Sequence, residues 1–171
     1  QSVRRIMTLK VKRGIFKAEQ PADVQDQIAR ALEVVGSAEH KRVEAEAAAR
    51  SVTLVKNDGV LPLNMDEKAT IAVVGTTYVD ELADAIRKHH ANTVTIKVTN
   101  NTLTDEQRKQ VEEADAVIIG SYTFDVKGRS SDNPLMKLYR EISQQADPPG
   151  IGVGIRNPYD IMAYPEVDAY L

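Results

Sequence analysis

Short apolar runs that end in glycine or polar residues set the pattern of this chain. The first spans residues 70–75 and leads into an amphipathic segment at 80–90, and similar runs follow at 116–120 and 150–155. An unbroken apolar run that feeds an amphipathic helix is typical of a parallel strand covered on both faces. The pattern therefore predicts a three-layer α/β sandwich with a mainly parallel sheet, with any chemistry just past the carboxyl ends of the strands.

The segments between these runs complete the predicted sheet and its helices. Apolar and polar residues alternate over 93–99, which predicts a half-exposed edge strand. Thr104 followed by Gln107 is the spacing of a capping box, so a helix begins there. Leu135, Leu138 and Ile142 give the 134–145 segment a helical period. The polar stretch 121–134 is then the longest loop of the core and a candidate ligand loop.

Helices are predicted to precede the sandwich. Residues 1–16 are basic and amphipathic and should end near Gly14, 21–35 form a second helix that starts at a proline, and 37–56 form a long alanine-rich helix. The extended segment 60–63 contains a proline, so it should cover the sheet edge and not enter the sheet. A basic helix such as the first can bind a membrane surface or nucleic acid, but one this short is more often simply solvated.

Composition limits the classes of function. Hydrophobic residues make up 42% and charged residues 27% of the 171 positions, and the net charge is −3, which is typical of a globular protein and disfavours a polyanion partner. There is no cysteine, so disulfides and thiolate metal sites are excluded, while the compartment stays open, with an extracytoplasmic location favoured over a cytoplasmic one. The first residue, Gln1, and the apolar beginning at 168–171 are expected of a fragment cut from a longer protein.

Cofactor motifs find little support. The stretch 150–154 has glycines spaced as G-x-G-x-G within a strand, and Pro158 stands where a helix would have to hold a pyrophosphate, so it does not match a dinucleotide fingerprint. His89 and His90 are neighbours that diverge by about 100° on a helix, and His40 is expected at the surface. We therefore expect no cofactor and no metal.

Catalytic groups are also hard to place. Asp125, Asp132 and Asp160 are the carboxylates in predicted loops at strand ends, where a lone Asp usually caps a turn. No serine, histidine and aspartate converge on one set of loops. The most unusual string is 156–160, Arg-Asn-Pro-Tyr-Asp, which leaves a buried strand directly into polar groups. Arg156 there either pairs with an interdomain carboxylate or contacts a ligand.

Three segments, spread over nearly the whole chain, resemble the C-terminal part of two-domain β-N-acetylhexosaminidases of glycoside hydrolase family 3. The middle segment is the most specific, because it joins a helix, a turn and a proline-bearing extension in one ordered run. The segments are Arg4-Arg5-Ile6-Met7-Thr8-Leu9-Lys10, Ala49-Arg50-Ser51-Val52-Thr53-Leu54-Val55-Lys56-Asn57-Asp58-Gly59-Val60-Leu61-Pro62-Leu63 and Arg156-Asn157-Pro158-Tyr159-Asp160-Ile161.

The resemblance implies a division of the chain and of the chemistry. Residues 1–16 would be the last helix of a (β/α)₈ barrel, 17–36 the interdomain connection and 37–171 the sandwich. The nucleophilic Asp and its partner His lie in the barrel in this family, so the chain alone should be inactive. The parent enzyme would remove terminal β-linked N-acetylglucosamine from cell-wall or chitin-derived sugars by a retaining mechanism, and the fragment could self-associate through its uncovered barrel contacts.

The face that would border the saccharide follows from the strand ends. Arg156 and Asn157, with Ser121 and Tyr122 at the neighbouring strand end, are the predicted substrate-binding residues. Two other classes of function stay open: a carbohydrate-binding or interaction module without catalysis, which the absence of Trp disfavours, and a nucleotide-binding protein, which the glycine spacing disfavours.

Overall fold

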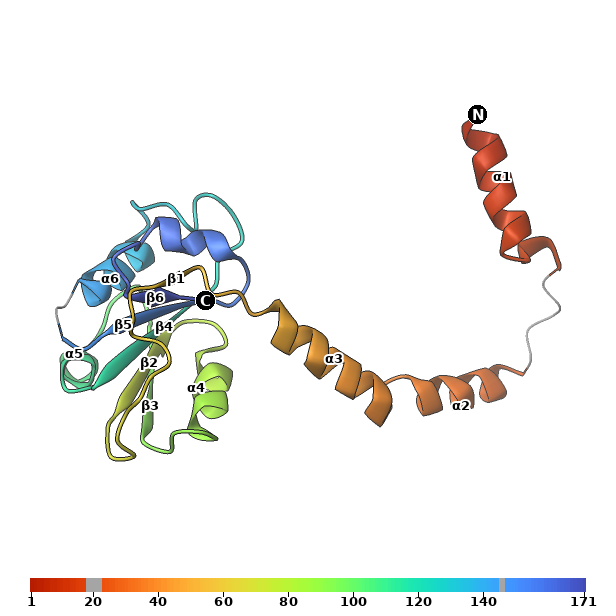
Figure 1. Cartoon of the computed structure of the whole chain (residues 1–171). Coiled ribbons are helices and arrows are strands. Elements are labelled where there is room, and N and C mark those ends of the chain that lie inside the picture. Colours follow the sequence, from red (N-terminus) through yellow and green to blue (C-terminus); the bar gives the residue numbers. More distant parts are fainter. Residues whose placement is uncertain (18–22, 145–146) are drawn as a thin grey trace. The chain divides into compact units, whose positions relative to one another are not determined.

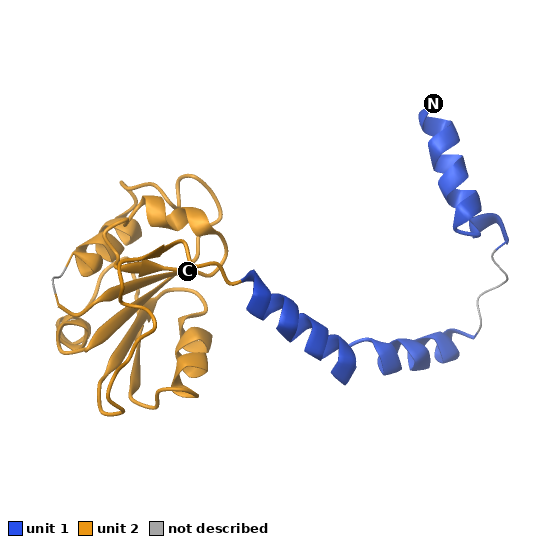
Figure 2. Ribbon diagram, viewed as in Figure 1, with its two compact units in different colours: residues 1–51 blue, residues 52–171 orange. Residues whose placement is uncertain are grey.

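The computed structural model describes residues 1–17, 23–144 and 147–171 and divides into two compact units. The first unit is Gln1–Ser51 and the second is Val52–Leu171, as Figure 2 shows. The helix 38–51, which the sequence placed in the sandwich, belongs to the first unit. None of the helices in the described ranges is long and apolar enough to cross a membrane.

The first unit consists of helices whose residues are not buried. They are α1 (Ser2–Lys12), the 3₁₀ helix η1 (Ile15–Lys17), α2 (Val24–Val34) and α3 (Ala38–Ser51). Gly14 and Gly36 take positive φ angles of 69° and 73°, which end the segments before them as predicted. The predicted start of the second helix at Pro21 lies outside the described residues, and the helix is capped by the side chain of Asp23.

The third helix is shorter than predicted. It ends at Ser51, and the next residues are extended: the N–H of Val55 donates to the carbonyl of Tyr170, and Lys56–Asn57 form strand β1. The prediction of a helix through residue 56 was therefore wrong. Val52, Thr53 and Val55 are β-branched and favour an extended chain, and the sheet supplies backbone partners that a helix would forgo.

The second unit is built on one mainly parallel sheet, so the predicted α/β fold is confirmed. The strand order is β1-β6-β5-β4-β2-β3, and only β1 runs antiparallel to its neighbour among the strands of the described part (Figure 1). The strands are β1 (Lys56–Asn57), β2 (Ile71–Gly75), β3 (Thr93–Lys97), β4 (Ala116–Ser121), β5 (Gly150–Gly154) and β6 (Ala169–Tyr170). Strand β3 lies at the edge of this sheet, as its alternating pattern predicted.

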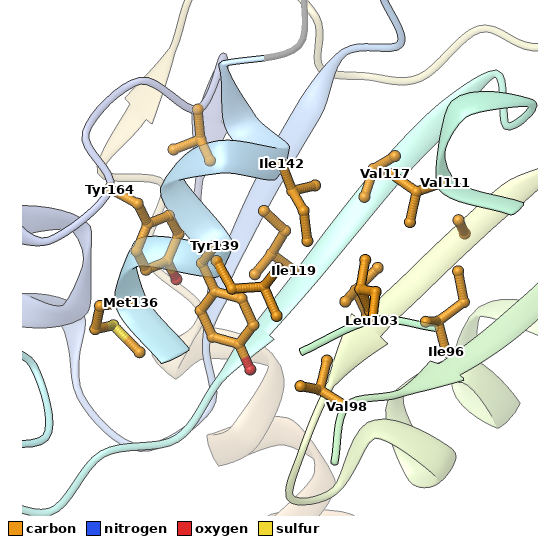
Figure 3. Close-up of a cluster of buried hydrophobic side chains, with 14 of the residues drawn as sticks. Ile96, Val98, Leu103, Val111, Val117, Ile119, Met136, Tyr139, Ile142 and Tyr164 are labelled. Atoms are coloured by element: carbon orange, nitrogen blue, oxygen red, sulfur yellow. The ribbon is translucent and has the colours of Figure 1, made fainter. Parts of the chain in front are cut away.

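Helices cover both faces of the sheet. Alternate residues of β2 point to opposite faces, so Ala72 and Val74 join one buried cluster and Ile71 and Val73 the other. The first cluster, shown in Figure 3, includes side chains of α5 (Asp105–Glu112) and α6 (Pro134–Ser143), and the second includes side chains of α4 (Val79–Arg87). The predicted end of α6 at Gln145 lies outside the described residues.

The proline-bearing segment 60–63 covers a face of the sheet. Val60, Leu61 and Leu63 pack against the second cluster, alongside α4. The segment was predicted to shield the sheet edge; its apolar side chains instead pack on the second cluster, on a face of the sheet, where burial of apolar surface stabilises them.

The glycines of β5 make room for tyrosines. A Cβ at Gly152 would lie 2.8 Å from Cε2 of Tyr170 and 3.2 Å from Cε2 of Tyr164, and one at Gly154 would lie 2.6 Å from the carbonyl oxygen of Asn157. Glycines on one face of a strand let a helix or another backbone come close. The structure shows mainly the rings of Tyr164 and Tyr170, with one backbone carbonyl beside Gly154.

Replacing Thr104 with alanine should lower the free energy of unfolding by about 1 kcal/mol. Thr104 caps α5 by accepting from the N–H of Gln107, and the Gln107 side chain accepts from the N–H of Thr104, which is the predicted capping box. Chemical denaturation of the variant measures the loss, with the exposed Thr77→Ala as the control. Equal stability of the two variants would show that the cap contributes nothing.

Candidate functional site

The candidate site lies where the connections of the central strands diverge. Strand β2 leads through α4 to β3 on one side, whereas its neighbour β4 leads through α6 to β5 on the other. The space outside the carboxyl ends of two such strands is where open α/β sheets bind ligands. Tyr78 follows β2 and Tyr122 follows β4, and their ring centroids are 5.3 Å apart in an edge-to-face contact. This edge of the sheet therefore carries an aromatic cluster.

Tyr78 has a strained backbone. Its φ angle is +59°, in the left-handed region that residues other than glycine rarely adopt, and it immediately precedes α4. Such a conformation costs of order 1–3 kcal/mol and persists only where the surroundings impose it. The side chain of Tyr78 is nevertheless 50% exposed. The fold thus holds a tyrosine toward solvent at an energetic cost, which is common at binding sites.

Arg156, which follows β5, completes the cluster. Its Cζ lies 4.1 Å from the ring centroid of Phe124 and 5.7 Å from that of Tyr122, and its Nη1 donates to the Tyr122 hydroxyl at 3.3 Å. The rings of Tyr122 and Phe124 are in turn 5.1 Å apart. Phe124 is 69% exposed. We call Tyr78, Tyr122, Phe124 and Arg156 the aromatic–arginine face.

Arg156 lacks a carboxylate partner among the described residues. No Asp or Glu oxygen in these ranges lies within ion-pair distance of its guanidinium. Its stabilising contacts are with aromatic rings, which attract the cation through their negative faces. The alternative in which Arg156 pairs with a carboxylate is thus not realised within the described part of this chain.

A buried hydrogen-bond network holds the two halves of the face together. The hydroxyl of Thr123 donates to Oδ1 of Asp160, and Nδ2 of Asn157 donates to the carbonyl oxygen of Thr123 at 3.1 Å and to its hydroxyl at 3.3 Å. Oδ1 of Asn157 accepts from the N–H of Tyr159. Thr123 lies between Tyr122 and Phe124, and Asn157 follows Arg156, so this network fixes the arginine against the rings.

The four predicted substrate-binding residues have different environments. Arg156 and Tyr122 lie together on the face. The side chain of Asn157 is occupied by the network, and Ser121 is fully buried, so neither presents its side chain to a ligand on the face. We therefore no longer place Ser121 at a surface site: the last residue of β4 points into the core.

Sequence reasoning missed Phe124 and Tyr78. Both are aromatic residues that follow a buried strand within a few positions, and that placement was the signal available for them. Two of the loop aspartates also differ in their environments. Asp125 accepts from the N–H of Gly128 and so stabilises a turn, as expected, whereas Asp160 is fully buried and accepts from Thr123. Asp160 is a structural group of the network.

The tyrosines beneath the face cannot act as ionised groups at neutral pH. Tyr139, Tyr164 and Tyr170 are buried, and burial raises the pKa of each phenol above its ordinary value. The hydroxyl of Tyr139 donates to the carbonyl oxygen of Gly120 at 3.3 Å. The described residues contain no group of three or more His, Cys, Asp or Glu side chains that could hold a metal ion.

Comparisons with known proteins agree with this architecture. No family model matches the chain. It is 26% identical to β-hexosaminidase A of Pseudoalteromonas piscicida over an alignment of 159 residues, which covers 80% of this chain and 26% of that protein. The chain thus spans about a quarter of the length of this curated relative.

Two solved structures share the fold. One is a fungal multi-domain glycoside hydrolase family 3 β-N-acetylglucosaminidase with a GCN5-related glucosamine N-acetyltransferase region, at a TM-score of 0.66 and 24% identity, covering 88% of this chain and 17% of that one. The other is a family 3 β-N-acetylglucosaminidase from Paenibacillus sp. str. FPU-7, at a TM-score of 0.63 and 19% identity, covering 99% of this chain and 32% of that one.

The resemblance to glycoside hydrolase family 3 is confirmed. The chain is similar to the C-terminal part of the family's β-N-acetylglucosaminidases. In each of these relatives it corresponds to a minor share of a longer polypeptide, so the matching region is one domain within a larger protein.

Proposed function

We propose that this chain is the non-catalytic C-terminal domain of a family 3 β-N-acetylhexosaminidase. The observation that supports the proposal most strongly is the match of nearly the whole chain to a minor part of such enzymes. The described residues at the carboxyl edge add a second reason. They present an arginine and aromatic rings, and the one buried carboxylate among them, Asp160, is closed off from solvent and accepts from the Thr123 hydroxyl through Oδ1, while its Oδ2 has no hydrogen-bond partner in the described ranges. A retaining glycosidase needs a nucleophile and an acid/base around one bond.

The exposed helices fit a role beside another domain. In α1 the apolar side chains of Ile6, Met7 and Leu9 are all exposed, as are those of Ile28 and Leu32 in α2. Apolar side chains at three- and four-residue spacing form one face of a helix, and such a face usually packs against a partner. We assign residues 1–16 to the last helix of a (β/α)₈ barrel, 17–36 to the connection and 37–171 to the sandwich domain, whose compact α/β unit is Val52–Leu171.

In the complete enzyme the barrel would carry the chemistry. Its Asp attacks the anomeric carbon and forms a glycosyl-enzyme intermediate, while an Asp-assisted His protonates the leaving oxygen and then deprotonates the water that releases the sugar. The substrate would be a terminal β-linked N-acetylglucosamine of cell-wall or chitin-derived sugars. The aromatic–arginine face would border the groove that holds it.

The complete protein from the parent reading frame tests this proposal. We expect it to hydrolyse a chromogenic N-acetyl-β-D-glucosaminide, and proton NMR of the reaction should show the β-anomer of free N-acetylglucosamine first, because two displacements retain the configuration. Heat-denatured protein is the control. Initial release of the α-anomer, or no hydrolysis of any N-acetylglucosaminide, would contradict the proposal.

A carbohydrate-binding module without catalysis is the second candidate. The exposed rings of Tyr78 and Phe124 favour it, because aromatic faces stack on the C–H faces of sugars. The parent reading frame distinguishes the two candidates. A start codon near Gln1 would favour the module, and a barrel-length coding segment before Gln1 would favour the hydrolase domain.

A further inference from the structure

We propose that Arg156 is the anchor of a carboxylate-binding subsite on the aromatic–arginine face, and that its ligand is a carboxylate-bearing saccharide. The carboxylate part of this inference comes from the contacts of Arg156 alone. The saccharide part rests on the proposed function, and the experiment below contains no turnover measurement, so the two can fail separately.

The guanidinium of Arg156 is held in a way that leaves donors free. The guanidinium carbon lies 4.1 Å from the ring centroid of Phe124, and within the described ranges Nη1 alone has a hydrogen bond, which it donates to the Tyr122 hydroxyl. A guanidinium whose flat face contacts a ring keeps its N–H groups in its own plane, where they can still donate at its edges. Those groups form a fork that matches the two oxygens of a carboxylate. Because Arg156 has no carboxylate partner among the described residues, these N–H groups can bind the carboxylate of a ligand.

The subsite is organised before any ligand arrives. Arg156 is tethered at its head by Tyr122 and Phe124, and the network of Asn157, Thr123 and Asp160 fixes the chain beside it. Ordering a free arginine on binding costs side-chain entropy. Much of that cost is already met in this structure, which is expected of a binding residue and not of a solvated surface arginine.

The surroundings of the fork favour a sugar over a peptide. Phe124 lies against the guanidinium and is 69% exposed, and Tyr78, which contacts Tyr122, is 50% exposed. A sugar acid can place a C–H face on an exposed ring, a hydroxyl on the phenol of Tyr122 and its carboxylate on Arg156. An acidic peptide side chain would fill only the last of these positions.

Titration of the folded 171-residue chain with sodium D-glucuronate, followed by NMR at constant ionic strength, tests the subsite. We expect glucuronate to bind at least ten-fold more tightly than its neutral counterpart D-glucose, and Arg156→Met to weaken glucuronate binding at least ten-fold. Arg156→Lys should also weaken it, because it keeps the charge and loses the fork. Arg129→Met is the matched control, since Arg129 lies over Tyr159 at 5.4 Å in a similar contact, and it should bind as the parent does.

Other outcomes identify other ligands. Equal affinity for glucuronate and acetate, or for glucuronate and N-acetylglutamate amide, would overturn the saccharide assignment. Glucuronate binding that is unchanged in Arg156→Met, or equally weakened in Arg129→Met, would overturn the role of Arg156, as would no binding at all. Melting temperatures of the variants show that each is folded, so that lost binding reports the site and not the fold.

Discussion

Gly152→Ala is expected to lower the free energy of unfolding by about 3 kcal/mol, the upper end of the range for inserting a methyl group into a packed core. The added Cβ would meet the rings of Tyr170 and Tyr164, and both tyrosines are fully buried. Neither ring can move without displacing its neighbours, because their centroids are 6.0 Å apart in a tilted contact and Tyr164 also meets Tyr139 edge-to-face. Since domains are stable by only about 5–15 kcal/mol, this is a large loss.

Denaturant unfolding of matched variants measures this effect. Gly150 lies on the same strand and face, but its nearest neighbour is 3.6 Å from an added Cβ, which is ordinary contact. Gly150→Ala should therefore cost well under half as much. Tyr170→Leu removes the obstructing ring, so Gly152→Ala combined with Tyr170→Leu should lose less stability than the sum of the single variants. Equal losses for Gly150→Ala and Gly152→Ala would show that the tyrosines do not confine the strand.

Most of the sheet could be predicted because its signals are local. The apolar runs of β2 and β4, the alternation of β3 and the capping box at Thr104 each specify one element without reference to the rest of the chain. The wrong predictions concern elements whose hydrogen-bond partners are distant in the sequence. Helix α3 stops at Ser51 because Val55 and the strand after it pair with β6, more than a hundred positions later. The β-branched residues after Ser51 favour an extended chain, but nothing near residue 51 specifies β6 as its partner.

The candidate site was predictable only in part for the same reason. The strand-end rule brought Arg156 and Tyr122 to one edge of the sheet. Whether a side chain at that edge faces solvent depends on the packing of the whole loop. The sequence therefore could not distinguish the buried Ser121 and the hydrogen-bonded Asn157 from side chains that are free to bind a ligand. Phe124 was missed because an exposed aromatic residue looks like a core residue until its neighbours are known.

The role of a supporting domain gives these features one explanation. Tyr78 has a strained left-handed conformation, and Asp160 is buried beside Thr123. Neither feature forms a catalytic dyad among the described residues. Both features instead help to fix the aromatic–arginine face at the strand ends. Such a face can position or recognise a saccharide while another domain cleaves it.

Catalytic inactivity of the isolated chain is the second large expected effect. In the proposed division the barrel supplies both the carboxylate that forms the glycosyl-enzyme intermediate and the histidine that transfers the proton, so the isolated chain would lack them. Enzymes accelerate their reactions by about 10⁶-fold or more. The complete protein should therefore exceed the isolated chain by at least about that factor under identical conditions.

Turnover of a chromogenic N-acetyl-β-D-glucosaminide by the purified 171-residue chain is the most direct measurement. Circular dichroism should first establish that the chain is folded, and an active β-N-acetylglucosaminidase added to the same cuvette provides the positive control. We predict a rate equal to that of buffer alone. A steady rate that rises in proportion to chain concentration, and persists through further purification, would contradict the role of a non-catalytic domain.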